Sequence, residues 1–324
     1  GNTVFLLPEQ EFSRDKNDEL KRVTVLRADD TSLYISQDIG TAILKITDHK
    51  LDYSIYVVGS EQEYHFKCLF AILKALGYEW AANCYHLSYG MVYLPEGKMK
   101  SREGKIVDAD DLITAMLTLA EAEIRRRDPE IGLSDEDVKN RAEKIGVGAI
   151  KFYLLRVRPT LSINFDPAES ISFDGFTGPY CQYAYARICG ILEKEKNSQR
   201  KRQNPGFSFL GNSEEVQLLQ KLIEYPREVK SAVADLNPSR IAVHIFNTAK
   251  AFNQFYNKHP VLKAENEELI DARLALIKAT AVVNSKGGEE LAGKSIGRVV
   301  SVNQRRSAVW TLESQQASAA PTMA

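Results

Sequence analysis

The sequence predicts an α/β half with a parallel sheet, followed by an all-α half. Two observations carry this prediction. An apolar run over 54–59 is followed by a short polar turn, an amphipathic stretch over 64–76 and a second apolar run over 84–94. This is the order strand, helix, strand that connects parallel strands by a right-handed crossover. From residue 112 onward, apolar residues recur at helical spacing, which predicts a series of helices.

The composition is that of an ordinary globular protein. The 324 residues are 44% hydrophobic and 26% charged, with a formal net charge of −1. Only local clusters of cations can therefore attract a polyanion. No stretch has the pattern of a signal peptide or a membrane span, so no membrane partner is expected. The four cysteines, Cys68, Cys84, Cys181 and Cys189, lack metal-ligand spacing and predict reduced thiols in a cytoplasmic protein without a metal site. Three of them lie in apolar helical runs and are expected to be buried: Cys68, Cys181 and Cys189.

The first elements expected are a short buried strand over 23–26 and a helix over 32–46, after a mixed stretch that contains a polar loop. On this helix Tyr34 and Asp38 are four residues apart, so both point from one face. The carboxylate can fork onto a guanidinium while the phenol lies beside it, which would hold a planar cation. A tyrosine on the helix surface beside a solvated aspartate is the alternative.

Polar residues follow the two apolar runs of the crossover. In parallel sheets the ligand lies beyond the carboxyl ends of the strands. Gln62, His65 and Gly90 fall at these ends, although His65 alone can be a structural histidine. Their convergence predicts a ligand site at one edge of a partial Rossmann-type sheet.

A basic loop over 95–107 follows the second run. It carries Lys98, Lys100, Arg102 and Lys105, with the glycines at 97 and 104 as pivots, and mobile positive charge of this kind can close over a polyphosphate. The three carboxylates within 108–111 then suit the positive end of a helix dipole. A solvated lysine-rich hairpin is the alternative for the loop.

The rest of the chain is expected to be helical, with an irregular connector over 163–173. One helix ends in the three arginines of 125–127, which favours the negative end of its dipole or, alternatively, offers a basic patch to RNA. His244 and His259 are expected to be structural. The predicted helices cover 112–127, 134–157, 175–196, 213–236, 237–259 and 266–283.

A stripe of aromatic and basic side chains marks the helix over 175–196. Tyr180, Tyr183 and Arg187 recur at i, i+3 and i+7, and the flanking sequence has an excess of cations. Aromatic rings and a guanidinium on one face can stack unpaired bases and hold the phosphate between them. A buried core stripe is the alternative.

Three runs of this sequence together resemble the arginyl-tRNA synthetases, a family of class I aminoacyl-tRNA synthetases. The similarity extends from about residue 20 to about residue 280, and the pattern from Asp174 to Arg187 is hard to obtain by chance. The runs are YVVGSEQEYHFKCLFAILKALGYEW, HLSYGMVYLPEGKMKSREGKIVDADDL and SISFDGFTGPYCQYAYARICGIL.

The resemblance implies a cytoplasmic, monomeric ligase. It would activate arginine with ATP and Mg²⁺, pass it to tRNA-Arg and hold no protein-bound metal. The residues implied to bind arginine are Tyr34, Asp38 and Gln62. Those implied to border the adenine of ATP are His65, Gly90, Met91 and Val92. Those implied to contact the tRNA are Tyr180, Tyr183 and Arg187.

The basic loop stands where class I synthetases carry their KMSKS loop, which stabilises charge on the phosphates. The loop here is a variant, so which cation takes the catalytic role stays open among the three candidates: Lys98, Lys100 and Arg102. Four regions are expected. They are the second half of the catalytic nucleotide-binding domain (1–127), a helical connector (128–175), a helical anticodon-binding domain (176–283) and a divergent, disordered tail (284–324).

Two departures from the family predict a fragment that is inactive alone. The chain begins on Gly1, and the HIGH signature, whose histidines help bind ATP, is absent. From residue 284 the resemblance fails. A non-catalytic RNA-binding protein derived from a synthetase is the alternative function. A cysteinyl synthetase is disfavoured because the cysteines here lack zinc-ligand spacing.

Overall fold

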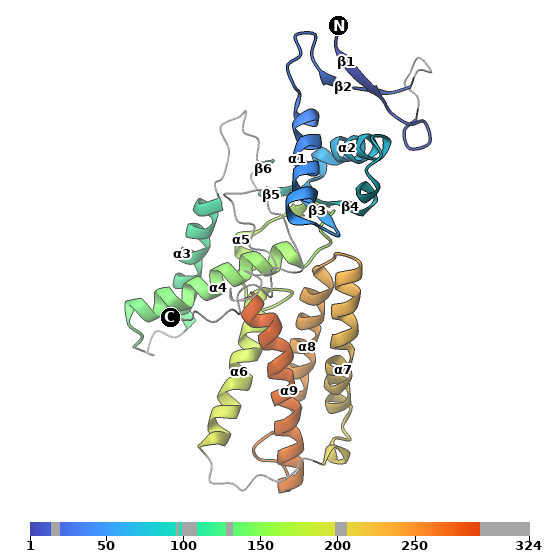
Figure 1. Ribbon diagram of the computed structural model, residues 1–324. Coiled ribbons are helices and arrows are strands. Elements are labelled where there is room, and N and C mark those ends of the chain that lie inside the picture. Colours follow the sequence, from blue (N-terminus) through green and yellow to red (C-terminus); the bar gives the residue numbers. More distant parts are fainter. Residues whose placement is uncertain (14–19, 95–96, 99–108, 128–131, 198–205, 292–324) are drawn as a thin grey trace, which may run out of the picture. The chain divides into compact units, whose positions relative to one another are not determined.

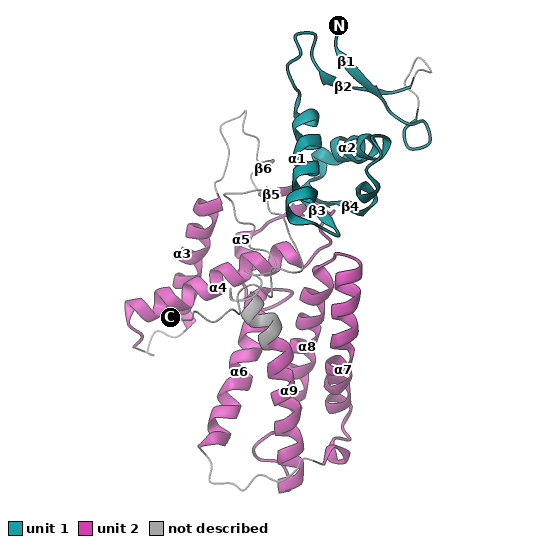
Figure 2. Ribbon diagram, in the orientation of Figure 1, with its two compact units in different colours: residues 1–91, 302–324 teal, residues 92–301 magenta. Residues whose placement is uncertain are grey.

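A computed structural model describes residues 1–13, 20–94, 97–98, 109–127, 132–197 and 206–291 (Figure 1). The described chain forms two compact units, residues 1–91 and residues 92–291 (Figure 2). Among the helices in these ranges, not one combines the length and apolarity needed to cross a bilayer. The two units are considered separately below.

Unit 1 contains the predicted crossover. Strands β3 (Ser54–Gly59) and β4 (Cys84–Tyr89) pair in parallel, in register from Ser54 opposite Cys84 to Gly59 opposite Tyr89. Between them lie the short helix η1 (Ser60–Gln62), the helix α2 (Glu63–Ala75) and the short helix η2 (Glu79–Asn83). The helix α1 (Tyr34–His49) precedes β3. The strand–helix–strand prediction is therefore confirmed.

The core of unit 1 covers one face of this pair of strands. Tyr56 and Val58 of β3 pack against a cluster of buried side chains on α1 and α2, and the ring of His86 of β4 lies 4.5 Å from that of Phe66. The alternating residues on the other face include Val57, Tyr85 and Tyr89, which are exposed. The buried cluster on the helices comprises Ile35, Ala42, Phe66, Leu69, Ile72 and Leu73.

A second, antiparallel pair of strands opens unit 1. Strand β1 (Thr3–Leu6) pairs with β2 (Arg22–Leu26), where only the second strand was expected. The mixed stretch before the polar loop, for which no element was specified, therefore contains a strand. The run is only four residues long, and it becomes a strand through hydrogen bonds to β2, which local sequence does not encode.

Unit 2 begins with a small mixed sheet and continues as helices. Strand β5 (Val92–Leu94) lies between β6 (Gly97–Lys98), which is antiparallel to it, and β7 (Ile163–Asn164), which is parallel. The predicted strand over 84–94 is thus two strands, in different sheets. The helices are α3 (Ala109–Arg127), α4 (Asp135–Leu155), α5 (Pro167–Ser170), α6 (Gly178–Lys196), η4 (Phe207–Phe209), α7 (Ser213–Ala234), α8 (Ser239–Lys258) and α9 (Glu267–Leu291).

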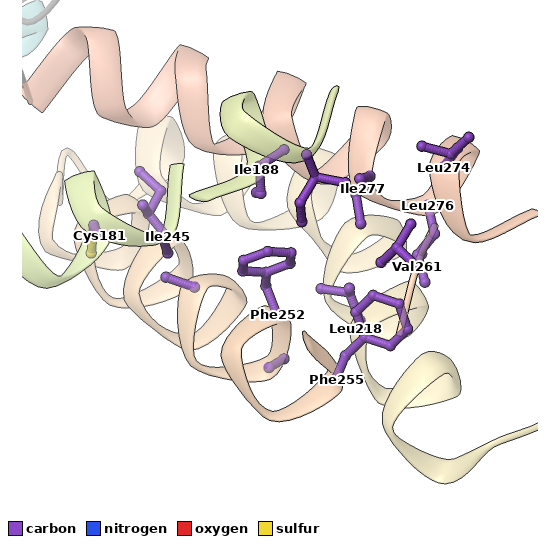
Figure 3. Packing of buried hydrophobic residues seen from close by; sticks show 14 of the residues in the cluster. Cys181, Ile188, Leu218, Ile245, Phe252, Phe255, Val261, Leu274, Leu276 and Ile277 are labelled. Atoms are coloured by element: carbon purple, nitrogen blue, oxygen red, sulfur yellow. The ribbon is translucent and has the colours of Figure 1, made fainter. Parts of the chain in front are cut away.

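Helices α6 to α9 form a bundle around one hydrophobic core (Figure 3). Ile188, Leu218, Phe252 and Ile277, one from each helix, are completely buried there. A smaller core joins α3, α4 and the connector through side chains that include Met116 and Phe165. The expected irregular connector over 163–173 therefore contains β7 and α5, which anchor it to these elements.

Two helices of unit 2 cross at very short range. A Cβ atom placed on Gly178, in the first turn of α6, would lie 2.7 Å from the carbonyl oxygen of Gly148 on α4. Thr177 caps α6, because its side chain accepts a hydrogen bond from the backbone of Tyr180. Glycine at this position is what lets the start of α6 rest on α4.

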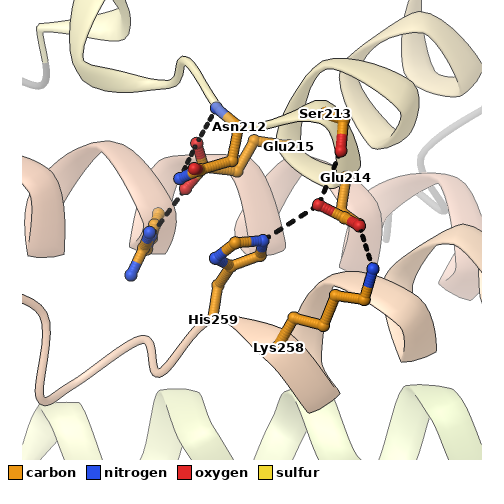
Figure 4. Close-up of polar contacts among 7 residues, drawn as sticks. Asn212, Ser213, Glu214, Glu215, Lys258 and His259 are labelled. Atoms are coloured by element: carbon orange, nitrogen blue, oxygen red, sulfur yellow. Dashed lines mark hydrogen bonds and ion pairs between the residues drawn. The ribbon is translucent and has the colours of Figure 1, made fainter.

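A polar cluster ties the start of α7 to α8 and α9 (Figure 4). Glu215 is fully buried and accepts a hydrogen bond of 2.7 Å from Arg273 Nε of α9. Its other oxygen accepts from the backbone of Asn212, which completes a capping box. Next to it, Glu214 contacts Lys258 and His259 at the end of α8. His259 is therefore held by a carboxylate, in agreement with a structural role.

The last helix runs further than predicted. Helix α9 continues to Leu291, whereas an end at residue 283 was expected because two glycines follow at 287 and 288. A glycine in a helix interior lowers helix stability by about 1 kcal/mol relative to alanine. Helix α9 nevertheless continues through both glycines. The remainder of the predicted tail, 292–324, lies outside the described residues.

Candidate functional site

The side chains predicted to hold a planar cation lie on the first two turns of α1. Tyr34 begins the helix and Asp38 lies one turn further along the same face. Gln62 ends η1 directly after strand β3, and His65 is in the first turn of α2. Two segments that are far apart in the sequence thus contribute to the same region of unit 1.

These four side chains line one open hollow of about 370 Å³, together with Val58 of β3 and Phe66 of α2. Val58 and Phe66 form part of its wall. The polar groups come from the start of α1 and from the segment that follows strand β3. Tyr34 is 81% exposed, so its ring is free of close packing in this structure. The hollow has the size of a small-molecule site and carries a few convergent polar groups.

A hydrogen bond crosses this hollow. His65 Nε2 lies 2.7 Å from Asp38 Oδ2, and the exposed fractions of the two side chains are 26% and 44%. The bond engages one carboxylate oxygen; within the described residues, Oδ1 accepts no side-chain hydrogen bond. Each carboxylate oxygen can accept more than one hydrogen bond, so Oδ1 and the remaining acceptor site of Oδ2 stay available for the planar fork of a guanidinium.

A second cation lies further along α1. Burial lowers the pKa of Lys45, while the negative charge of Asp38 acts in the opposite direction. The Lys45 ammonium lies 5.0 Å from the centre of the Tyr56 ring on β3. Lys45 thus packs on the strand β3, and the charge of Asp38 acts on it along the same helix.

The residues expected around adenine and phosphate are only partly described. Gly90 and Met91 follow β4 at the end of unit 1, and Val92 opens β5 of unit 2. Lys98 lies in β6, of which the backbone alone is described. Lys100 and Arg102 fall outside the described residues, so their predicted roles stay predictions.

On α6, two of the three expected side chains come together. Arg187 Nη2 donates to the hydroxyl of Tyr183 at 2.9 Å, and Nη1 donates to Asn253 Oδ1 of α8 at 2.8 Å. The guanidinium lies 4.6 Å from the ring centre of Tyr183 and 4.8 Å from that of Tyr256, also on α8. The cation is thus held between two aromatic rings and an amide.

The third member of the stripe is directed elsewhere. Tyr180 is partly buried against the bundle core, and its ring centre lies 5.2 Å from that of Phe246. Helical spacing placed it beside Tyr183, but the packing of α8 on α6 takes its ring into the apolar interior. Tyr183 and Tyr256 keep 45% and 37% of their surface exposed.

Asn253 and Tyr256 did not emerge from the sequence. Their three-residue spacing on α8 puts them on one face, but only the packing of α8 on α6 brings that face to Arg187. On its other side Tyr183 meets Phe173 edge to face, with ring centres 6.4 Å apart. Arg127 of α3 lies 4.3 Å from the centre of the Phe173 ring. We call Tyr183, Arg187, Asn253 and Tyr256 the α6–α8 cluster.

Two family models match this chain. Residues 1–166 match the catalytic domain of the class I tRNA synthetases for arginine, "tRNA synthetases class I (R), catalytic domain", and residues 181–291 match the "DALR anticodon binding domain". The second match continues past residue 284, where the resemblance was expected to fail, so the expected boundary was too early. It ends at the last residue of α9.

Individual relatives agree with these models. Arginine–tRNA ligase of Treponema denticola is 46% identical over 271 residues, a match that covers 82% of this chain and 45% of that protein. The enzyme of the same name from Parabacteroides distasonis is 43% identical over 282 residues, or 85% of this chain and 46% of that one. The chain therefore spans about half the length of the curated relatives it matches.

Solved structures show the same fold. The arginyl-tRNA synthetase of Thermus thermophilus superposes with a TM-score of 0.76 at 24% identity, over 88% of this chain and 52% of that one. The Plasmodium falciparum enzyme superposes with a TM-score of 0.70 at 21% identity, over 87% and 47% of the two chains.

Proposed function

Because this chain belongs to the arginyl-tRNA synthetase family, we propose that it carries the arginine-binding and tRNA-binding parts of an arginine–tRNA ligase. The complete reaction activates arginine with ATP as an adenylate, with Mg²⁺ as part of the nucleotide substrate, and then transfers arginine to tRNA-Arg in the cytoplasm. The proposal assigns no activity to the 324-residue chain alone.

The observation that supports an arginine site is the hollow lined by Tyr34, Asp38 and Gln62. In the proposed complex the Asp38 carboxylate accepts hydrogen bonds from the guanidinium, and Tyr34 and Gln62 orient the side chain. A planar, permanently charged guanidinium suits a carboxylate better than an ammonium does. Recognition by charge and by geometry would thus select arginine over lysine.

The chemistry proposed for the complete enzyme needs no covalent intermediate with the protein. The arginine carboxylate attacks the α-phosphorus of ATP, pyrophosphate leaves, and the adenylate is then passed to the 3′ end of the tRNA. Positioning of the two substrates and compensation of charge supply the acceleration. Lys98, Lys100 and Arg102 remain the proposed source of that positive charge, and His65, Gly90, Met91 and Val92 remain the residues predicted to border the adenine.

Arginine binding tests the first part of this proposal. Titration of the chain with arginine, followed by calorimetry or NMR, should show saturable binding that lysine and the uncharged analogue citrulline do not reproduce. The Asp38→Asn variant should weaken arginine at least about tenfold, since a hydrogen bond between two charged groups contributes about 1.5–3 kcal/mol. The Asp48→Asn variant removes an exposed carboxylate from the same helix and should bind arginine normally.

A purely RNA-binding protein is the second candidate, and the α6–α8 cluster favours it. Exposed tyrosine rings beside a fixed guanidinium can stack unpaired bases. Tyr183→Ala and Tyr256→Ala should each weaken binding of a tRNA-Arg anticodon stem-loop, whereas the exposed Tyr53 of unit 1 provides a neutral control. Stem-loop binding without any arginine binding would favour the RNA-binding protein over the ligase.

A further inference from the structure

We infer that His65 is a positioning residue of the arginine site, which holds the Asp38 carboxylate in the orientation that receives the guanidinium. This inference rests on the proposed function of the hollow. It differs from the role that resemblance implies for His65, which is to border the adenine of ATP. The two roles predict losses of affinity for different ligands.

The geometry of the pair supports the positioning role. The 2.7 Å separation between His65 Nε2 and Asp38 Oδ2 is the length of a hydrogen bond to a charged group. The two side chains come from different helices and line the same hollow. The imidazole is the less exposed partner, at 26% against 44% for the carboxylate. The histidine therefore supports the aspartate from the protein side, and the aspartate offers more of its surface to a ligand.

The imidazole is itself held in place. Its ring meets the buried ring of Phe66 edge to face, with centres 5.6 Å apart and planes at 87°. Phe66 in turn packs on His86 and Tyr56 of the two parallel strands. A rigid aromatic layer thus fixes His65, and His65 fixes one oxygen of Asp38.

The chemistry of the bond sets the tautomer. An ionised carboxylate only accepts hydrogen bonds, so Nε2 of His65 must carry the proton. The two oxygens of a carboxylate offer about four acceptor sites, so this bond leaves the others to receive the guanidinium. The charge of Asp38 also acts on Lys45, further along the same helix.

Preorganisation of this kind should appear as a modest, ligand-specific loss when it is removed. Freezing one flexible side chain on binding costs about 0.5–1.5 kcal/mol, which corresponds to a loss of about twofold to tenfold in affinity. The His65→Leu variant should therefore bind arginine about twofold to tenfold more weakly. The His65→Gln variant, whose amide nitrogen can occupy the position of Nε2, should recover most of that affinity.

Titrations of the full chain with arginine and with ATP separate the alternatives. If His65→Leu weakens arginine, spares ATP and is rescued by His65→Gln, the inference stands. If His65→Leu weakens ATP and leaves arginine unchanged, or if glutamine fails to rescue, the inference is overturned. Absence of arginine binding by the wild-type chain would overturn the proposed arginine site itself, which is a separate result.

A spectroscopic readout guards against a variant that fails to fold. In ligand-free wild-type protein, ¹⁵N NMR of the imidazole should show the proton of His65 on Nε2. The Asp38→Asn variant should shift that resonance, and Asp48→Asn should leave it unchanged. An Nε2 without a proton, or a resonance indifferent to Asp38→Asn, would contradict the hydrogen bond on which the positioning role depends.

Discussion

Replacement of Glu215 by alanine should destabilise the helical bundle more than the loss of any surface ion pair. Glu215 and Arg273 retain 0% and 5% of their side-chain exposure, so both charges are buried. The carboxylate accepts from Arg273 Nε at 2.7 Å and from the backbone of Asn212 at 2.9 Å. Arg273 also donates to the carbonyl oxygen of Pro260 at 2.8 Å, which fixes it between α9 and the end of α8.

Two terms determine the size of the effect. Removal of one partner of a buried ion pair costs about 3–5 kcal/mol, because the other charge is left without compensation. Loss of the capping box at the start of α7 costs about 1 kcal/mol more. The better helix propensity of alanine returns only a few tenths of a kcal/mol. Glu215→Ala should therefore lower the free energy of unfolding by at least about 3 kcal/mol.

Urea denaturation followed by the helical circular dichroism signal measures this loss. The matched control is Glu224→Ala on the same helix, where Glu224 pairs with Lys221 at 2.8 Å and both side chains are 35% exposed. A half-exposed pair contributes about 0–1 kcal/mol. Equal losses for Glu215→Ala and Glu224→Ala would refute the reasoning, because burial would then not decide the cost.

The same carboxylate should make the bundle sensitive to acid. Burial alone would raise the pKa of Glu215, but hydrogen bonds from Asn212 and Arg273 outweigh it and hold that pKa below its ordinary value. A group with a lowered folded pKa contributes its full stability above the unfolded value, about 4.3. The free energy of unfolding should therefore fall as the pH drops below that value, and less so in Glu215→Ala.

Three further predictions concern other parts of unit 2. Gly178→Ala should lower the free energy of unfolding by about 1–3 kcal/mol, because the added methyl group overpacks the crossing of α4 and α6. Gly190 has open space around it on the same helix, so Gly190→Ala should be neutral or stabilising. Thermal unfolding of the two variants compares these effects. Burial lowers the pKa of His244, so wild-type stability should decrease as the pH falls below about 6.5, and His244→Leu should flatten that part of the profile. Cys189, expected to be buried, is exposed on α6, whereas Cys181 is buried. Burial raises the pKa of the Cys181 thiol, so alkylation of the native protein should modify Cys189 and spare Cys181, as mass spectrometry would show.

Much of the fold could be predicted because its signals are local. The apolar run over 54–59, the polar turn and the amphipathic helix after it are contiguous, and they became β3, η1 and α2. Strand β1 could not be predicted in this way, since its pairing with β2 joins segments separated by a loop. The split of the predicted strand over 84–94 also depends on distant partners, because β5 takes β7 as its neighbour.

The candidate site likewise has features that local sequence predicts and features that depend on long-range packing. Helix periodicity placed Tyr34 and Asp38 on one face, and the rule for strand ends placed Gln62 and His65 near a ligand. The bond between His65 and Asp38 joins residues 27 positions apart, which periodicity does not specify. Likewise, helical spacing grouped Tyr180 with Tyr183 but could not say which neighbouring helix would cover each ring. Long-range packing decided both outcomes.

The sheet of unit 1 has a consequence for how that unit resists unfolding. Strands β3 and β4 bury side chains against α1 and α2 on one face, while Val57, Tyr85 and Tyr89 meet solvent on the other. Parallel strands normally gain apolar burial from two layers, and this ribbon gains it from one. Protection of the amide protons of these strands from exchange therefore depends on the packing of α1 and α2. Loss of the packing of either helix would expose the backbone next to the hollow.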